Sequence, residues 1–574
     1  MQKTIKRRPK LKQKLAEAND LPDWLLQIYA DRGLEKSSEL DLGLKHLIPV
    51  SQFTNAVTAA NSLIEHLEKQ STIVIVGDYD VDGAVSSVIV YEVLKACGWE
   101  SVHYLVPDRF VDGYGLSVSI VDKASELGAN LIITVDNGMS SFSGVDHARG
   151  LNIDVIITDH HLPASTEPNA LHIVNPNARD ENFNANNLCG AGVVFYLMVA
   201  LVNQLDAEGW FHSKNHSKPN LASYLDLVAL ATIADVVPLD YNNRIIVQEG
   251  VKRIRAGHTR MGIKALLQVA KKDYRHIDSQ DFGFVIGPRL NAAGRLEDMT
   301  IGVECLLSKD MTSAYELASI LDDINLQRRE IENADKQQAL EILNTNDVLE
   351  NLEQQFSLSL FNENWHQGVV GLVASRLKEQ FYKPTVIFAQ TENGYLKGSA
   401  RSIEGFHIKH ALDGIVAKYP DLIDKYGGHA MAAGLNIEQY KFPDFCHAFE
   451  EAVREHYQSI QPEPVLWTDG ELASENINLS SAKLLEQQGP WGNRFPIPVF
   501  QGEFELEEQR VVGQKHLKMI LRDELNQLHQ AIAFNQNELQ CQPFATVNTV
   551  YELDVNRFRG SETHQLLIRQ ISTA

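Results

Sequence analysis

The sequence predicts an α/β protein with two α/β lobes joined by a long helix and followed by a C-terminal β-barrel. Three observations carry this prediction. Short apolar runs alternate with helical patterns in two separate stretches, a charged helical pattern without Gly or Pro covers Met311–Leu343, and short alternating runs fill the C-terminal part. Strands that alternate with helices favour a parallel sheet with right-handed crossovers. The helical pattern is too polar to be core throughout, so we expect a strut between the lobes.

In the first lobe, a helix over residues 56–69 precedes four predicted strands, at 73–76, 102–106, 131–135 and 155–158. The first strand is a run of β-branched residues, as is usual for a buried strand. Three of the four end in acidic residues: Asp78, Asp80 and Asp82 follow the first, Asp136 the third, and Asp159, His160 and His161 the fourth. Because ligands bind outside the carboxyl ends of parallel strands, one crevice is expected to collect these side chains. A single such motif would equally fit a solvated acidic turn.

A further carboxylate, Asp235, ends the apolar helical pattern of residues 221–234. The negative end of the helix dipole disfavours a carboxylate there. Either Asp235 is exposed or a cation holds it, and the sequence leaves both open.

The candidate ligands are oxygen-rich, with imidazoles and no thiolate, which suits Mn²⁺ or Mg²⁺ better than zinc. There are more carboxylates than one ion needs, so two ions are expected, an arrangement suited to phosphoester hydrolysis. A glycosidase pair would not gather so many anions. A Rossmann site would need GxGxxG after the first strand, which is absent here.

Four glycine- or small-residue segments carry side chains that could contact phosphates. Three of them, 107–117, 397–402 and 426–434, are predicted to be loops, although ordinary turns fit each one singly, and the fourth, 284–299, is glycine-punctuated with no element assigned to it. The residues of interest in them are Arg109, Arg289, Asn291, Arg295, Ser399, Arg401 and His429.

Five predicted strands close the chain, at residues 500–506, 516–521, 528–534, 547–555 and 566–571. Five short strands favour a small OB-like barrel, which in many proteins binds single strands by aromatic stacking. A purely structural barrel fits the spacing as well. The predicted organisation is a basic arm at 1–40, a first α/β domain at 41–310, the helix at 311–349, a second α/β domain at 350–460 and the barrel domain at 461–574.

A formal charge of −23 argues against a uniformly basic nucleic-acid surface, but not against a local channel or a metal site. Five scattered cysteines without CxxC spacing argue against a disulfide framework. No apolar segment follows the basic start, and the longest apolar run, 193–202, is too short to span a bilayer, so we expect a cytoplasmic protein. The basic residues of the arm fit a solvated tail or phosphate contacts: Lys3, Lys6, Arg7, Arg8, Lys10, Lys12 and Lys14.

Seven motifs together resemble the DHH phosphoesterase superfamily and its accessory DHHA1 domain. GDYDVDG, DNG, DHH and ADVVPL, at residues 77–83, 136–138, 159–161 and 234–239, resemble the four DHH motifs. WHQGVVG, GSARS and GGHAMAAG resemble DHHA1, and GPRLNAAGR, the long helix and the barrel are similar to the branch of single-stranded-DNA-specific exonucleases. In other branches a histidine precedes the first DxD aspartate by four residues. Val76 stands at that position in this chain, which argues against a pyrophosphatase. The resemblance implies that Asp78 takes the place of the histidine as a metal ligand.

The resemblance implies an exonuclease that uses Mn²⁺ or Mg²⁺ to degrade single-stranded DNA from its 5′ end into nucleotides, during recombination and repair. By motif, Asp80 would hold the first metal, Asp82 the second and Asp136 both. His160 and Asp235 would complete the second site, and His161 would contact the scissile phosphate. The cationic loops would grip phosphates, and His366 and His429 would face the cleft. A single-stranded-DNA-binding protein and a RecQ-type helicase are the implied partners.

Two alternatives remain at this point. One is an enzyme for short oligonucleotides or cyclic dinucleotides, which the barrel and strut disfavour because a short substrate needs no extended track. The other is a binding module without catalysis, which the full set of candidate ligands disfavours.

Overall fold

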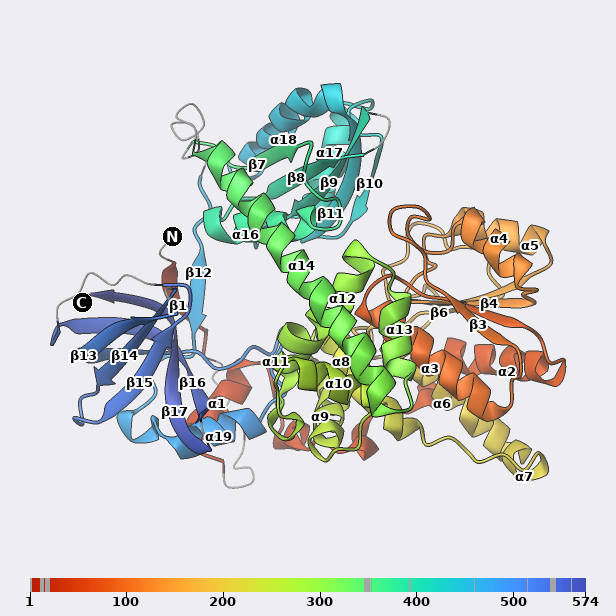
Figure 1. Cartoon of the computed structure of the whole chain (residues 1–574), viewed down its shortest axis with the longest axis horizontal. Coiled ribbons are helices and arrows are strands. Elements are labelled where there is room, and N and C mark those ends of the chain that lie inside the picture. The colour runs from red at the N-terminus through yellow and green to blue at the C-terminus, as the bar shows by residue number, and fades with distance from the viewer. Residues whose placement is uncertain are drawn as a thin grey trace. The chain divides into compact units, whose positions relative to one another are not determined.

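The computed structural model describes residues 3–10, 15, 21–344, 352, 354–391, 394–458, 460–513, 515–536, 543–558 and 560–573. The chain divides into two compact units (Figure 1). The larger unit comprises Arg7–Ile324 and Thr468–Ala574, and the smaller unit Met1–Lys6 and Asn325–Trp467. The helix α14 (Met311–Leu343) passes from one unit into the other as a single 33-residue element, as its uninterrupted helical pattern predicts.

The larger unit contains a five-stranded sheet whose neighbouring strands all run parallel. Its order is β3-β2-β4-β5-β6, with bounds Val102–Leu105, Ile73–Val76, Leu131–Val135, Asp154–Thr158 and His172–Val174. Alternate residues of β2 enter two different cores. Ile73 and Ile75 join the core built with α2, α3 and α6, whereas Val74 and Val76 join the core built with α4 and α5. Helices therefore cover both faces, which confirms the predicted parallel α/β lobe.

The covering helices are α2 (Thr54–Glu68), α3 (Val81–Cys97), α4 (Val118–Glu126), α5 (Phe142–Gly150) and α6 (Gly190–Ala207). Among the described helices, α6 alone is long and apolar enough to cross a membrane, and 72% of it is buried in the protein. The helix is longer than the apolar run counted in the sequence. Its burial identifies a core helix, whose apolar residues face other helices.

Further helices complete this unit. They are α1 (Asp23–Asp31), α7 (Trp210–Ser213), α8 (Leu225–Ala234), α9 (Tyr241–Arg255), α10 (Met261–Val269), α11 (Ser279–Asp281), α12 (Gly287–Leu296), α13 (Thr300–Leu307) and α19 (Leu479–Gln487), with 3₁₀ turns at Ser37–Leu40, Leu44–His46, Val50–Gln52, Leu221–Tyr224, Tyr274–His276 and Ser474–Asn476. A π-helical turn over Phe282–Ile286 leads into α12. The glycine-punctuated segment 284–299, for which the sequence predicts no particular element, is thus mainly helical, and its proline lies in the first turn of α12, where a helix tolerates it.

The same unit ends in a closed five-stranded barrel of order β13-β14-β15-β17-β16. Its strands are β13 (Phe500–Val512), β14 (His516–Arg522), β15 (Leu528–Ala533), β16 (Thr546–Phe558) and β17 (Ser561–Thr573). Only β15 and β17 pair in parallel. All five predicted strands are present, so the barrel is confirmed.

The smaller unit is a mixed sheet of order β10-β11-β9-β8-β7, in which only β7 and β8 are parallel. Its strands are β7 (Leu358–Asn362), β8 (Thr385–Gln390), β9 (Tyr395–Arg401), β10 (Lys425–Gly428) and β11 (Ala432–Glu438). The helices α16 (Val370–Phe381), α17 (Ile408–Lys418) and α18 (Phe442–His456), a 3₁₀ turn at Gln439–Lys441 and a short pair of β1 (Thr4–Arg7) with β12 (Val465–Thr468) complete the list.

Two sequence predictions differ from this fold. The segments 397–402 and 426–434 were expected as loops, but most of their residues belong to β9, β10 and β11. Small residues have low strand propensity, and cross-strand pairing outweighs it here. The first forty residues are also not a peripheral arm throughout, because α1 buries Leu25 and Tyr29 completely in the larger core. Lys12, Lys14 and Cys541 lie outside the described residues, and the other four cysteines are free.

Candidate metal centre

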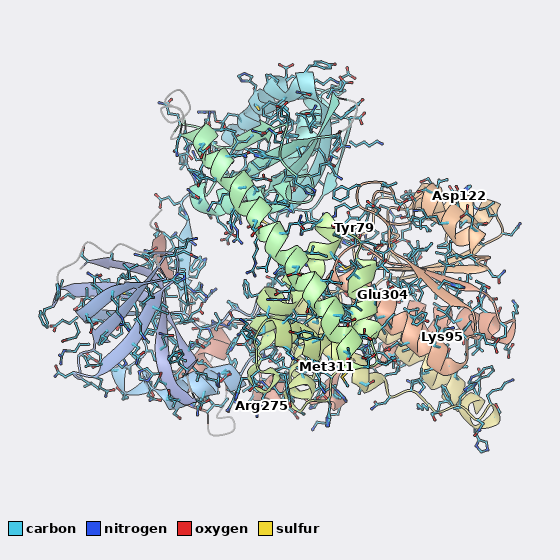
Figure 2. The ribbon with its side chains drawn as sticks, in the orientation of Figure 1. Tyr79, Lys95, Asp122, Arg275, Glu304 and Met311 are labelled. Carbon is cyan, nitrogen blue, oxygen red and sulfur yellow. The ribbon has the colours of Figure 1, made fainter. Side chains whose placement is uncertain are left out.

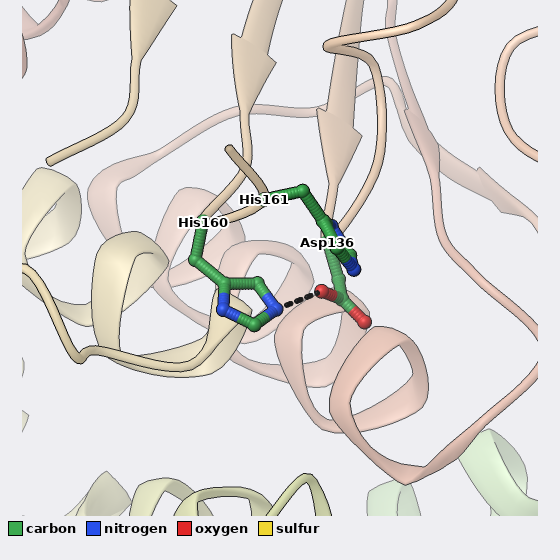
Figure 3. A group of neighbouring side chains, drawn as sticks. All are labelled: Asp136, His160 and His161. Carbon is green, nitrogen blue, oxygen red and sulfur yellow. Dashed lines mark ion pairs between the residues drawn. The ribbon is translucent and has the colours of Figure 1, made fainter. Parts of the chain in front are cut away.

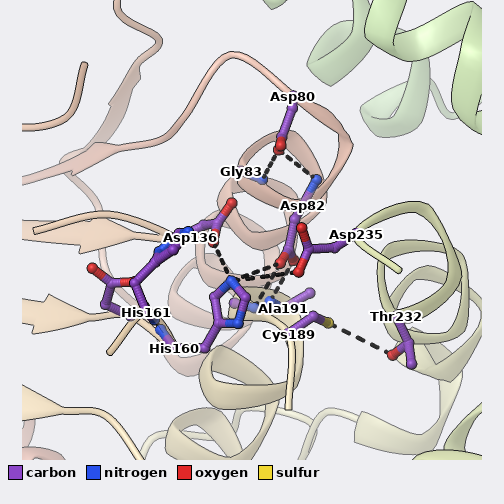
Figure 4. A network of polar contacts seen from close by, with 12 residues as sticks. Asp80, Asp82, Gly83, Asp136, His160, His161, Cys189, Ala191, Thr232 and Asp235 are labelled. Atoms are coloured by element: carbon purple, nitrogen blue, oxygen red, sulfur yellow. Dashed lines mark hydrogen bonds and ion pairs between the residues drawn. The ribbon is translucent and has the colours of Figure 1, made fainter. Parts of the chain in front are cut away.

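The acidic strand ends converge. Carboxylate and imidazole atoms fall into three groups, each within 4.8 Å: Asp78, Asp80 and Asp136; Asp82, His160 and Asp235; and Asp136, His160 and His161. The first three aspartates follow β2, Asp136 follows β4, the histidines follow β5, and Asp235 caps the C-terminus of α8. Figure 4 shows Asp82, Asp136, His160 and Asp235 turned toward one another. The gathering of acidic strand ends expected at the carboxyl edge of the sheet is therefore present.

Local hydrogen bonds fix the DxD loop. The Asp80 carboxylate caps α3 by accepting from the amides of Asp82 (2.9 Å) and Gly83 (3.1 Å). Asp82 in turn accepts from the first two amides of α6, those of Gly190 (2.6 Å) and Ala191 (2.7 Å). A side chain at Gly190 would place its Cβ 2.6 Å from the Asp136 Cβ, so only glycine permits this approach. The positive end of α6 thus holds Asp82 beside Asp136.

Asp136 and His160 form the centre of the cluster (Figure 3). The His160 Nε2 lies 3.2 Å from Asp136 Oδ1, 3.5 Å from Asp235 Oδ2 and 4.0 Å from Asp82 Oδ2. Asp136 is 2% exposed, and its Oδ1 accepts no hydrogen bond from any residue that the structure describes. Such a buried carboxylate oxygen is costly unless a cation completes its surroundings.

His161 and Asp159 form an ion pair at one side of the cluster. Asp159 Oδ1 lies 2.7 Å from His161 Nδ1 and also accepts from the His160 and His161 amides, while its Oδ2 accepts from Met139. Burial alone would lower the pKa of His161, but the hydrogen bond and charge of Asp159 raise it to about 9. Asp159, a candidate ligand in the sequence, is instead fully used in orienting its neighbour.

The electrostatics favour a divalent cation. Burial, and then neighbouring carboxylates, raise the pKa of Asp78, Asp136 and Asp235 well above the usual range and that of Asp82 to about 7. Like charges at this distance repel unless a cation lies among them. An oxygen-rich set with one imidazole and an orphaned buried oxygen fits Mn²⁺ or Mg²⁺. The sequence left open whether Asp235 is exposed or held by a cation. The structure places it in a cluster that needs a cation, which favours the second alternative.

These shifts predict that metal binding releases protons. A carboxylate whose pKa is raised on folding stabilises the metal-free protein below about pH 4, and this stability is lost as pH rises through the folded pKa. For Asp82 the loss extends to about pH 7. Because the metal takes the ionised form, Mn²⁺ affinity should rise from pH 5 to pH 7 by about tenfold or more. Titration calorimetry in two buffers of different ionisation enthalpy measures the protons released, and equal heats in both buffers would contradict this.

Three asparagines to which the sequence analysis assigned no role, one of them in the DNG motif, support the ligand loops. Asn137 Nδ2 donates to the carbonyls of Val76 (3.0 Å) and Val135 (2.9 Å). Asn175 and Asn177 donate to the carbonyls of His161 and His160, each at 2.9 Å. The last two stand directly after β6, so the triplet Asn-Pro-Asn was an available signal: a further polar strand end at the same edge of the sheet.

A fourth missed asparagine, Asn493, lies 257 residues after the loop that it contacts. Its Nδ2 donates to the Val236 carbonyl (2.6 Å), and its own carbonyl accepts from Leu239 (2.9 Å). Val236 has φ +59°, which is unusual for a β-branched residue, and it directly follows Asp235. Asn493 therefore holds a strained backbone next to a candidate ligand, and no local sequence pattern indicates it.

We expect Asn493→Ala to weaken metal binding more than folding. Loss of the side-chain bond to Val236 lets the 235–239 loop relax, so the Mn²⁺ concentration for half-maximal activity should rise about tenfold, the worth of one hydrogen bond, while the backbone bond from Leu239 remains. The melting temperature should stay within a few degrees. Arg494→Gln, on the adjacent exposed residue, is the matched control. An unchanged metal requirement in Asn493→Ala would disprove the positioning role.

Of the predicted phosphate-binding residues of the larger unit, some lie near the DxD loop and one is already neutralised by a carboxylate. The Arg109 guanidinium lies 3.9 Å from the ring centroid of Tyr79, which is labelled in Figure 2, and Asn291 accepts from the Val81 amide (3.1 Å), so both contact the DxD loop. Arg295 acts electrostatically on the same tyrosine. Arg289 is instead paired with Asp322 (2.8 Å) and bonded to the Val285 carbonyl (2.8 Å).

In the smaller unit, Ser399 and Arg401 lie together on β9, with Arg401 Nη1 donating to Ser399 Oγ (3.0 Å) and to the Ala400 carbonyl (2.8 Å). Gly371, near the start of α16, is adjacent: a Cβ there would lie 2.7 Å from Arg401 Nη2. His366 accepts from the Gly368 amide (3.1 Å), and burial lowers its pKa. His429 lies between β10 and β11.

Comparison with known proteins gives concordant results. Family models match at residues 72–232 (DHH family, N-terminal domain), 353–455 (DHHA1 domain) and 468–570 (RecJ OB domain). The single-stranded-DNA-specific exonucleases RecJ of Salmonella typhimurium and Escherichia coli are 46% and 45% identical over 558 and 560 residues, 96% of this chain and of each relative. The crystal structure of RecJ from Thermus thermophilus in complex with Mn²⁺ matches 98% of this chain and 80% of its own, with a TM-score of 0.77 and 27% identity. A second structure, exonuclease RecJ bound to manganese, matches 71% of this chain and 96% of its own, with a TM-score of 0.58 and 30% identity.

Proposed function

Since this chain belongs to the RecJ family of single-stranded-DNA-specific exonucleases, we propose that it removes nucleotides stepwise from the 5′ end of single-stranded DNA. Phosphodiester hydrolysis would take place at the cluster around Asp136 and His160, with two divalent cations. The observation that carries this proposal is the set of buried carboxylates with raised pKa values around one imidazole. Relatives solved with Mn²⁺ and with Mg²⁺ support the choice of metal.

The residues that would hold the ions are Asp78, Asp80, Asp82, Asp136, His160 and Asp235. When bound, such ions activate a water molecule and stabilise the leaving oxygen of a phosphodiester. The chain's own contribution is orientation and charge. Asp159 holds Nδ1 of His161, and with a pKa of about 9 the imidazole is protonated at neutral pH. In the proposed mechanism, its Nε2–H donates to a non-bridging oxygen of the scissile phosphate.

Substrate grip is assigned to cationic and polar side chains that are not metal ligands. In the larger unit these are Arg109, Arg295 and Asn291, near Tyr79 and the DxD loop, with Arg289 as a weaker candidate because Asp322 neutralises it. In the smaller unit they are Ser399, Arg401, His366 and His429. Backbone contacts of this kind give little sequence preference. We also propose that the enzyme acts in the cytoplasm during recombination and repair. Its proposed partners are a single-stranded-DNA-binding protein and a RecQ-type helicase.

The alternative, a phosphodiesterase for short oligonucleotides or cyclic dinucleotides, is not favoured. The near full-length relatives are all exonucleases by name, and a barrel of the RecJ OB type has no evident use for a dinucleotide. A rate on dinucleotides that exceeds the rate on long strands would revive it.

The deciding experiment uses one single strand labelled in turn at its 5′ and its 3′ end. With Mn²⁺, the 5′ label should leave at once as a mononucleotide, while the 3′-labelled strand shortens gradually. A duplex of the same sequence and a reaction with chelator serve as controls and should show no digestion. Immediate release of the 3′ label would overturn the proposed polarity, and cuts in the middle of the strand would overturn exonuclease action.

A further inference from the structure

A polar cavity of about 680 Å³ lies in the larger unit between α9, the 3₁₀ turn at Ser37–Leu40 and the segment at the end of α19. Arg244, Gln248 and Lys252 of α9 line it, together with Ser37 and Ser38 and with Gln488. The three α9 residues are spaced by four, so they share one face of the helix. None of them belongs to the metal cluster or to the predicted phosphate-binding residues.

Arg244 is the unusual member of this cavity. It is 3% exposed, its Nε is buried, and its guanidinium forms no hydrogen bond or ion pair with any residue that the structure describes. Its guanidinium lies instead against two aromatic faces, 4.6 Å from the ring centroid of Phe495 and 5.6 Å from that of Tyr241. Cation–π contacts recover about 2 kcal/mol, which is less than the several kcal/mol that a buried unpaired ion costs.

A neighbouring arginine shows what completes such a site. Trp491 and Phe495 stack with centroids 5.3 Å apart, and Arg32 lies over the Trp491 ring as Arg244 lies over Phe495. Arg32 is neutralised by both oxygens of Asp469, at 2.7 and 3.0 Å. Arg244 has no such carboxylate, so of two guanidiniums on one aromatic stack only one has its anion.

The carboxylates nearest to Arg244 form no ion pair with it. Asp41, which itself lines the cavity, is engaged by Lys45 (3.2 Å), His46 (2.9 Å) and the Gly43 amide (3.1 Å). Asp240 accepts from the Asn243 amide and from Asn187 Nδ2, both at 3.0 Å. Glu39 accepts from the amides of Glu35 and Lys36, both at 2.9 Å. Lys252 is exposed and, like Arg244, has no ion pair among the described residues. The cavity therefore offers two cations that form no ion pair with any residue the structure describes.

We propose that this cavity binds a phosphate group, with Arg244 and Lys252 as its charge partners. Hydroxyls of Ser37 and Ser38 and side-chain amides of Gln248 and Gln488 add neutral donors around the two cations. Two cations with several further donors suit the many acceptor oxygens of a phosphate better than the two of a carboxylate. The phosphate comes either from the backbone of a bound strand or from a free nucleotide or inorganic phosphate.

The first test is thermal. The Mg²⁺-loaded protein is melted with increasing inorganic phosphate, against sodium chloride of equal ionic strength, for the wild type, Arg244→Gln, Lys252→Gln and the matched control Lys218→Gln. Lys218 is a surface residue paired with Asp206, outside the cavity. Wild type and control should share a phosphate-induced rise in melting temperature that both cavity variants lose in large part. If Arg244→Gln does not fold, the phosphate-induced shift in the melting temperature of Lys252→Gln alone tests the proposal.

The second test identifies the source of the phosphate. Oligothymidylate binding is measured in an Asp136→Asn background, so that the strand is not cleaved, with and without Lys252→Gln and Arg244→Gln. About tenfold weaker binding, with a salt dependence reduced by about one ion, assigns the cavity to the DNA backbone. Unchanged DNA binding with loss of the inorganic phosphate response assigns it to free phosphate or nucleotide. Unchanged responses in both tests would overturn the proposal.

Discussion

Asp136→Asn should lower the rate of single-strand digestion by about 10³-fold or more, equivalent to about 4 kcal/mol of transition-state stabilisation. Asp136 belongs to two of the three ligand groups, and its Oδ1 is the buried oxygen that needs a cation. Asparagine keeps the shape and tolerates the observed φ of +60°, where most residues are strained. The change therefore removes a charge and little else.

The same substitution should raise the melting temperature of the metal-free protein. Burial and the charges of Asp82 and Asp80 oppose ionisation of Asp136, so a neutral amide relieves repulsion. Calorimetry with chelator and a gel assay of digestion measure the two effects on one preparation. Asp154→Asn is the matched control, because this half-exposed carboxylate begins β5, at the end of the strand away from the histidines. It should change the digestion rate by no more than about twofold and the melting temperature by no more than a few degrees. Substantial digestion by Asp136→Asn would remove this residue from the mechanism.

The parallel sheet and its acidic edge could be predicted because their signals are local. The strands β2, β4 and β5 are short runs rich in β-branched residues, and ligands follow each of them within a few residues, so the rule that strand ends share one edge places these ligands together. Asp235 follows a helix instead, and the sequence alone left its environment open. In the structure, Asp235 Oδ2 lies 3.5 Å from His160 Nε2, which places Asp235 in the metal cluster. No local sequence pattern indicates this contact.

The elements that sequence reasoning missed depend on distant partners. The Tyr29 hydroxyl of α1 donates to the Gln488 carbonyl, 459 residues away, and that docking turns a short polar-flanked segment into core. In β9, the residues Gly398, Ser399 and Ala400 have weak strand propensity, yet β8 and β11 pair with them on both sides. Asn493 reaches the Asp235 loop from the segment before the barrel. Tertiary contacts decide each of these cases.

Gly294→Ala is the second substitution for which we expect a large effect. Gly294 lies on α12, and a Cβ there would be 1.8 Å from the Tyr79 carbonyl oxygen and 2.8 Å from its carbon. Neither side can yield easily: Asn291 on the same helix accepts from the Val81 amide, and Asp80 caps α3 in the same loop. The methyl group must therefore displace the DxD loop that carries Asp78, Asp80 and Asp82.

A clash with backbone on both sides is expected to cost about 3 kcal/mol or more of stability, at the upper end of overpacked sites. Digestion should fall at least about 100-fold, because small displacements of positioned groups have such effects. Gly414→Ala is the control: Gly414 is in the middle of α17 with no atom near its would-be Cβ, so alanine should stabilise the helix by about 0.5–1 kcal/mol. Circular dichroism and melting curves separate lost folding from lost geometry. Full activity in Gly294→Ala would show that α12 does not constrain the DxD loop. It would also contradict the role of Asn291, on the same helix, in positioning that loop.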